Sequence, residues 1–264
     1  MGFAGLTVMD LRALKGVRRI SFVQVAREEE AIAASEAGMD MIGTAFIPER
    51  AHFAKAVPGT HFQYGLPWGK HASGKEALRD AMAAMAAGAQ SIYCGMSPSI
   101  VEVLAREGVP VICHVGLVPP KATWTGGYKA VGKSLDQALM LLQQVQDFEN
   151  AGAYAVEMEV IPAELAAEIT RRTSMLTISL GSGGDCDAQY LFSTDILGEN
   201  RGHIPRHAKT YRNFAAERDR MQAERVAAYR EYIADVNSGA FPTPDTTVEI
   251  DADVLSAALD RHRP

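Results

Sequence analysis

Two glutamates and a histidine lie in apolar segments where they could act as acids, bases or ligands. Glu157 and Glu159 stand in AYAVEMEVI, and His114 lies near the end of VPVICHVG. Side chains alternate along a strand, so the two carboxylates should face the same side. A buried carboxylate is costly unless it is paired, hydrogen-bonded or protonated. Glu159, His114 and Glu157 are therefore candidates for catalysis or for contact with a substrate, and a purely structural role is the alternative for each.

The elements that must position these groups are short apolar runs alternating with helical patterns. Strands are predicted at 19–25, 40–46, 60–66, 91–95, 109–116, 153–161, 176–181 and within 188–198. Helices are predicted at 28–38, 73–89, 97–108, 134–152 and 162–173, with Ser73 as an N-cap residue. Eight strands alternating with helices predict a (β/α)8 TIM barrel. A doubly wound open sheet is the alternative, but no GxGxxG motif follows the first strand.

The chain is long enough for one large domain and carries no sign of export or membrane insertion. We predict a single barrel domain over 1–264, with 205–264 as a highly charged C-terminal helical extension. A net charge of −6 argues against binding nucleic acid or an anionic membrane. The N-terminus lacks the pattern of a signal peptide, no apolar run could span a bilayer, and the three cysteines form no disulfide framework. We expect a cytoplasmic protein.

Further candidate residues lie near the carboxyl ends of the predicted strands, where TIM barrels place their chemistry. Gln63 and Tyr93 should point inward and could hydrogen-bond a substrate, with simple packing as the alternative. Ser182, in the glycine-rich loop GSGGDCD, should form part of the site wall. Lys129, in TGGYKAVGKS, could approach an acidic substrate if this loop closes, or could belong to a structural crossover.

Several motifs occur in the order of one known family. GMDMI, CHVGLVPP, GGYKAVGKS, MEVIPAELAAEIT, SLGSGGDCDAQYLFSTDILG and SGAFP make the chain similar, from about residue 10 to 245, to ketopantoate hydroxymethyltransferases. That family belongs to the phosphoenolpyruvate mutase/isocitrate lyase superfamily. The resemblance implies a homo-oligomeric barrel that transfers a hydroxymethyl group from methylenetetrahydrofolate to 3-methyl-2-oxobutanoate, with Mg²⁺ holding the 2-oxo acid. It places Glu159 at the family's catalytic base and His114 at its active-site histidine.

The chain departs from the family at the residues that would hold Mg²⁺ and the substrate carboxylate. Phe46, Gly65 and Gly95 stand where the family has three acidic ligands, and Tyr93 stands where it has a lysine. Because Mg²⁺ is bound through oxygen ligands, we expect no metal at the family's positions. The cofactors of this chain are therefore left open.

We predict an enzyme that makes or breaks a C–C bond on a small 2-oxo acid or related carbonyl compound. The reaction would be an aldol, hydroxymethyl-transfer or retro-aldol type passing through an enolate, with Glu159 as the base. One alternative is a lyase or hydrolase with a relocated metal site at His114, Glu157 and Glu159. Another is a non-catalytic homologue that binds a metabolite. The expected partners are a small-molecule substrate and other copies of the chain.

Overall fold

Eight parallel strands close into a barrel in the computed structural model, which describes residues 5–202 and 204–262. Each strand pairs with the next in chain order, and β8 pairs with β1. The strands are β1 (Ile20–Gln24), β2 (Met41–Ala45), β3 (His61–Gly65), β4 (Ser91–Tyr93), β5 (Val111–Gly116), β6 (Ala155–Glu159), β7 (Leu176–Leu180) and β8 (Ala188–Phe192). The predicted TIM barrel is confirmed.

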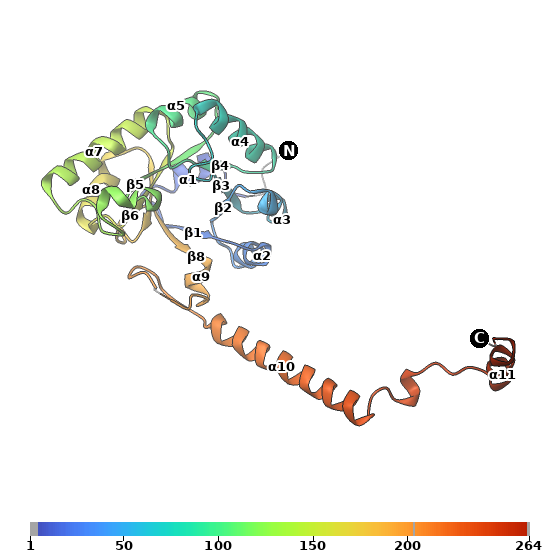
Figure 1. Cartoon of the computed structure of the whole chain (residues 1–264). Coiled ribbons are helices and arrows are strands. Elements are labelled where there is room, and N and C mark those ends of the chain that lie inside the picture. The colour runs from blue at the N-terminus through green and yellow to red at the C-terminus, as the bar shows by residue number, and fades with distance from the viewer. Residues whose placement is uncertain (1–4, 203, 263–264) are drawn as a thin grey trace. The chain divides into compact units, whose positions relative to one another are not determined.

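Helices between the strands cover the outside of the barrel (Figure 1). The longer ones are α2 (Glu28–Glu36), α4 (Gly74–Ala86), α5 (Pro98–Arg106), α7 (Leu135–Asn150) and α8 (Ala163–Arg172). Two short helices, α3 (Phe53–Ala56) and α6 (Ala122–Thr125), also lie between strands, whereas α1 (Val8–Ala13) precedes β1 and α9 (Ser193–Ile196) follows β8. Ser73 caps α4 as predicted, because its side chain accepts a hydrogen bond from the backbone N–H of Glu76.

The alternation of side chains divides the strands into an outer and an inner layer. On β6, Val156 and Met158 pack in the outer layer beneath the helices, whereas Ala155 joins the apolar cluster inside the barrel. The inner cluster fills the amino-terminal part of the barrel with residues such as Phe22 and Ile178. Glu157 and Glu159 share the inward parity of Ala155, so they stand above this packed interior.

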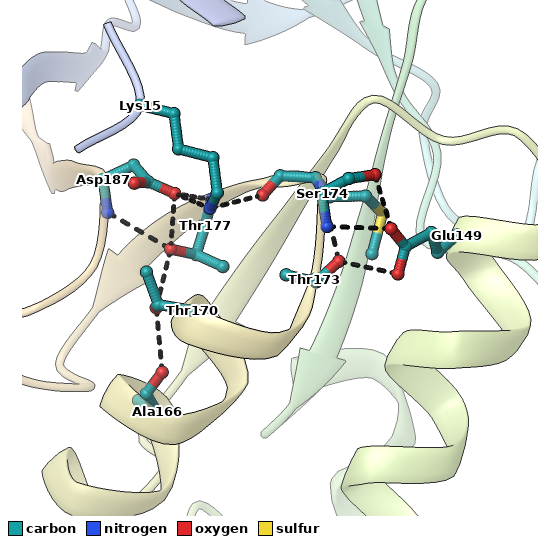
Figure 2. A network of polar contacts seen from close by, with 9 residues as sticks. Lys15, Glu149, Ala166, Thr170, Thr173, Ser174, Thr177 and Asp187 are labelled. Carbon is teal, nitrogen blue, oxygen red and sulfur yellow. Dashed lines mark hydrogen bonds and ion pairs between the residues drawn. The ribbon is translucent and has the colours of Figure 1, made fainter. Parts of the chain in front are cut away.

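A polar network fastens the amino-terminal ends of β7 and β8 to the rest of the barrel (Figure 2). The ammonium group of Lys15 lies 2.7 Å from the carboxylate of Asp187 and also donates to the carbonyl of Met175. The same carboxylate accepts hydrogen bonds from the backbone N–H and hydroxyl of Thr177. Nearby, Glu149 accepts hydrogen bonds from residues 173 and 174. This network is at the opposite end of the strands from Glu159, so it stabilises the barrel rather than the site.

The chain divides into two compact units between Arg212 and Asn213. The second contains α10 (Phe214–Ser238) and α11 (Ala252–Arg261). The predicted long charged helix is therefore present, and it begins at residue 214. No residue of α10 is buried, and tyrosine and isoleucine side chains are among those it exposes. Of the helices that the structure describes, none combines the length and apolar character needed to cross a bilayer.

Candidate active site

A cavity of about 240 Å³ opens at the carboxyl ends of the strands, where the sequence places the chemistry. Five of the predicted site residues line it together: Gln63, Tyr93, His114, Glu157 and Glu159. They come from the neighbouring strands β3 to β6, so closure of the sheet brings them together. The cavity wall is otherwise mostly apolar, with Trp68 and Leu180 among its residues.

His114 is the centre of the polar network in this cavity. Its Nε2 lies 3.1 Å from the carbonyl oxygen of Leu117, and its Nδ1 lies 2.8 Å from the hydroxyl oxygen of Tyr93. A carbonyl oxygen can only accept a hydrogen bond, so Nε2 carries the hydrogen. In the neutral ring Nδ1 is therefore the acceptor, and the Tyr93 hydroxyl donates to it.

The two glutamates approach different nitrogens of this imidazole ring. A carboxylate oxygen of Glu159 lies 3.4 Å from Nε2, whereas one of Glu157 lies 3.7 Å from Nδ1. Strand register explains this arrangement, because His114 is directly opposite Glu157 and Gly116 is opposite Glu159. The predicted common orientation of the two carboxylates is confirmed.

Glu157 is the more deeply buried of the two carboxylates. Burial raises its pKa from the usual 4.5 to about 7, an effect that the charge of His114 opposes and that of Glu159 reinforces. Near neutral pH this side chain therefore exists in both protonation states. Glu159 lies closer to the cavity mouth, at the carboxyl end of β6, where a substrate can reach it.

The backbone turns sharply immediately after Glu159. Val160 has a φ of 50°, a left-handed conformation that is unfavourable for a β-branched residue. Hydrogen bonds hold it there: its N–H donates to the carbonyl of Leu180, and its carbonyl accepts from the N–H of Val131. Strained backbone of this kind is common at functional sites, where surrounding contacts maintain it. Here it ends β6 with the Glu159 side chain at the cavity mouth.

The phenol of Tyr93 fills space next to two glycines. A Cβ atom at Gly95 would lie 2.8 Å from the Tyr93 hydroxyl oxygen, and one at Gly65 would lie 3.4 Å from its ring. Burial, together with the negative charges of Glu157 and Glu159, raises the pKa of Tyr93 well above its usual value of 10. Tyr93 is therefore a neutral phenol with a hydrogen to donate.

Two polar residues of the cavity, Gln24 and Tyr190, were missed by the sequence analysis. The Tyr190 hydroxyl donates to the side-chain oxygen of Gln24 at 3.0 Å. Gln24 ends β1, so the strand-end rule could have identified it, whereas Tyr190 lies in the middle of β8. Gln63 also contributes an amide: its side-chain oxygen is buried and has no hydrogen-bond partner among the described residues. This buried oxygen lies near Gly43, whereas the amide nitrogen lies near Gly65, which lines the cavity.

The other two predicted site residues lie outside the cavity lining. Ser182 is buried and ties the end of β6 in place, since its hydroxyl donates to the carbonyl of Met158 and accepts from the N–H of Ile161. Lys129 lies in the loop after α6, where its Nζ is near Gly126. Ser182 thus supports the wall, and contact of either residue with a substrate stays a prediction.

The residues present do not fit a divalent metal. Glu157 and Glu159 approach opposite nitrogens of the His114 ring, so the three side chains do not converge on one point, as the relocated site would require. Within residues 5–202 and 204–262, no group of three or more His, Cys, Asp or Glu side chains could hold a metal ion. At two of the positions where the sequence resemblance would place metal ligands, Phe46 packs against Tyr64 and Gly65 offers no side chain.

The closed barrel, with a carboxylate and hydrogen-bond donors at the carboxyl ends of its strands, defines a TIM-barrel enzyme site. A family model described as ketopantoate hydroxymethyltransferase matches residues 44–244. The chain belongs to this family, and it is an enzyme of the hydroxymethyltransferase-like type.

Individual relatives agree with this assignment, and solved structures share the fold. The chain is 39% identical over 199 residues to the 3-methyl-2-oxobutanoate hydroxymethyltransferase of Nitrosomonas eutropha, covering 72% of this chain and 71% of the relative. The enzyme of the same name from Deinococcus radiodurans is 36% identical over 228 residues, which cover 83% of this chain and 78% of the relative. The fold is similar to a crystal structure of 2,3-dimethylmalate lyase, a PEP mutase/isocitrate lyase superfamily member, with a TM-score of 0.52, 14% identity and 99% and 96% coverage. For a phosphonopyruvate hydrolase crystallised with oxalate and Mg²⁺ the TM-score is 0.54 and the identity 12%, with 97% of this chain and 99% of the hydrolase covered.

Proposed function

We propose that this enzyme makes or breaks a C–C bond next to the carbonyl group of a small substrate, with Glu159 as the base. The observation that carries this proposal is the position of Glu159 at the cavity mouth, 3.4 Å from His114 and beside the Tyr93–His114 hydrogen bond. A base at the mouth and a donor for the carbonyl oxygen are the two groups that enolisation requires.

The reaction would begin with removal of a proton from the carbon adjacent to the carbonyl. The proton passes to the carboxylate of Glu159, and its electron pair forms the carbon–carbon double bond of the enolate. The Tyr93 hydroxyl redirects its hydrogen from His114 to the oxygen that becomes negative. The enolate carbon then attacks the carbonyl carbon of an aldehyde: the C–C bond forms as the π bond of the aldehyde C=O breaks, and the resulting alkoxide takes the proton from Glu159. A methylene donor would supply its carbon as this aldehyde after water has cleaved its C–N bonds. In the reverse direction Glu159 takes the hydroxyl proton as the C–C bond breaks.

The substrate is proposed by class. The relatives are named for 3-methyl-2-oxobutanoate, and a cavity of about 240 Å³ suits a molecule of similar size. A small 2-oxo acid or a related carbonyl compound is therefore proposed for this chain. No step is assigned to a metal, because the cavity lacks a suitable ligand set. Methylenetetrahydrofolate is the one-carbon donor that the resemblance implies for the family, and the donor of this chain stays open.

Proton NMR in D₂O tests the proposed base by following the exchange of the substrate hydrogen on the carbon next to the carbonyl group. Glu159→Gln should slow this exchange at least about 100-fold, because the amide cannot accept the proton at neutral pH. Glu164→Gln is the matched control, since Glu164 is exposed in the first turn of α8, and it should exchange at the wild-type rate. Wild-type exchange by Glu159→Gln would refute the assignment of the base.

Assembly and location are proposed on separate observations. Self-association is supported by the exposed apolar side chains of α10, among them Tyr232 and Ile233, and sedimentation equilibrium would test it. A reducing compartment such as the cytoplasm is supported by three cysteines that are all free and buried.

A further inference from the structure

The cavity is lined by two carboxyl groups and, among the described residues, by no lysine or arginine side chain. The carboxyl groups belong to Glu157 and Glu159. Lys121 lines a neighbouring cavity instead, and its ammonium group donates to the backbone carbonyl of Gly95. The guanidinium of Arg50 donates to the hydroxyl of Thr44, a residue outside the cavity lining.

This charge distribution discriminates between classes of ligand. A substrate carboxylate would have to leave water and approach two buried acidic groups without gaining a lysine or arginine partner. Such a placement is unfavourable, because burial strengthens like-charge repulsion and the lost hydration is not replaced. An uncharged carbonyl compound avoids both costs and can still accept hydrogen bonds from the cavity.

The Tyr93 phenol fills space at the carboxyl ends of two neighbouring strands, β3 and β4. Its hydroxyl oxygen would be only 2.8 Å from a Cβ atom at Gly95, so a side chain at that position would collide with the phenol. A Cβ atom at Gly65 would lie 3.4 Å from the same edge of the ring, which is an ordinary contact distance. The phenol thus occupies the space that a side chain at Gly95 would need, and it brings a hydroxyl group into the cavity.

We propose that the cavity binds an uncharged carbonyl compound, and that the Tyr93 hydroxyl stabilises the enolate oxygen where a divalent metal would otherwise do so. This inference rests on the proposed function for the proton-transfer step and adds the class of substrate and the identity of the electrophile. Tyr93 is accordingly a catalytic residue. Its hydroxyl is oriented by the hydrogen bond to Nδ1 of His114, whose other nitrogen, Nε2, carries the ring hydrogen and donates it to the carbonyl of Leu117.

Two probes of nearly the same shape, one uncharged and one negatively charged, test whether the cavity prefers an uncharged substrate. In 3-methyl-2-butanone a methyl group stands where 3-methyl-2-oxobutanoate has its carboxylate, and both carry the same methine hydrogen next to the carbonyl. Exchange of this hydrogen in D₂O is measured with excess EDTA and with added Mg²⁺, each rate divided by the uncatalysed rate. We expect the ketone to exchange at least about tenfold faster than the acid, with no dependence on Mg²⁺.

Variants of two phenols test the role of Tyr93. Tyr93→Phe should slow ketone exchange by about 100- to 1000-fold, the loss typical when one donor to a developing oxyanion is removed. Tyr154→Phe is the matched control, because Tyr154 precedes β6 and lies in the inner cluster outside the cavity, and it should exchange like the wild type. Circular dichroism and thermal unfolding confirm that both variants are folded.

Three results would overturn the inference: faster exchange of the acid, a requirement for Mg²⁺, or wild-type exchange by Tyr93→Phe. Exchange of neither probe would contradict the proposed function instead. Calorimetric titration with Mg²⁺ and oxalate then decides the inference by itself, because oxalate with Mg²⁺ imitates a metal-bound enolate. If oxalate and Mg²⁺ do not bind, the result supports a cavity for uncharged ligands. If they bind and Glu159→Gln weakens this binding, the inference is overturned.

Discussion

Glu157 should make the folded protein less stable as the pH rises from about 4.5 to about 7. The folded pKa of its carboxyl group is about 7, whereas the usual value is 4.5. Between these values the folded state binds more protons than the unfolded state, so stability falls with rising pH. Each unit of difference between the folded and unfolded pKa corresponds to about 1.4 kcal/mol. At pH 8 the charged carboxylate should therefore lower the free energy of unfolding by roughly 3 kcal/mol, relative to the protonated group at low pH.

Glu157→Gln removes this titration while keeping nearly the same side-chain volume. Relative to wild type, the variant should gain up to about 3 kcal/mol between pH 5 and pH 8, because the wild-type carboxylate must be buried with its charge at the higher pH. The assay is urea unfolding followed by circular dichroism at several pH values. Glu164→Gln should show no such change, since its side chain is exposed. Parallel stability profiles for wild type and Glu157→Gln would refute the reasoning.

Two further substitutions test other parts of the structure. Gly95→Ala should slow enolate exchange about as much as Tyr93→Phe, because the new Cβ atom collides with the phenol hydroxyl, while Gly59→Ala, which has open space around it, should have no effect. Equal exchange rates in the two alanine variants would show that the phenol position is unimportant. Lys15→Met should lower the free energy of unfolding by about 3 kcal/mol at neutral pH, since it leaves the buried Asp187 carboxylate without its cation. Urea unfolding measures this loss, exchange should stay at the wild-type rate, and unchanged stability would contradict a structural role for the network.

The sequence alone determined the barrel and the candidates for its catalytic centre. Alternation of apolar strands and helical patterns is a local property, and it places each strand end at one rim of the barrel. The two-residue period of a strand likewise fixes Glu157 and Glu159 on one face. The strand-end rule and the family motifs then single out Glu159 and His114 from the chain's other acids and histidines.

How these groups meet depends on contacts between strands that are distant in the sequence. Register between β5 and β6 sets which glutamate faces which nitrogen of His114, and a backbone carbonyl three residues on fixes the histidine hydrogen. Closure of β8 onto β1 brings Tyr190 to Gln24 across 166 positions of sequence. The fit of the Tyr93 phenol beside two glycines depends on side-chain packing across strands. Local patterns carry no record of such contacts, because they arise only when distant strands pair and their side chains share one space.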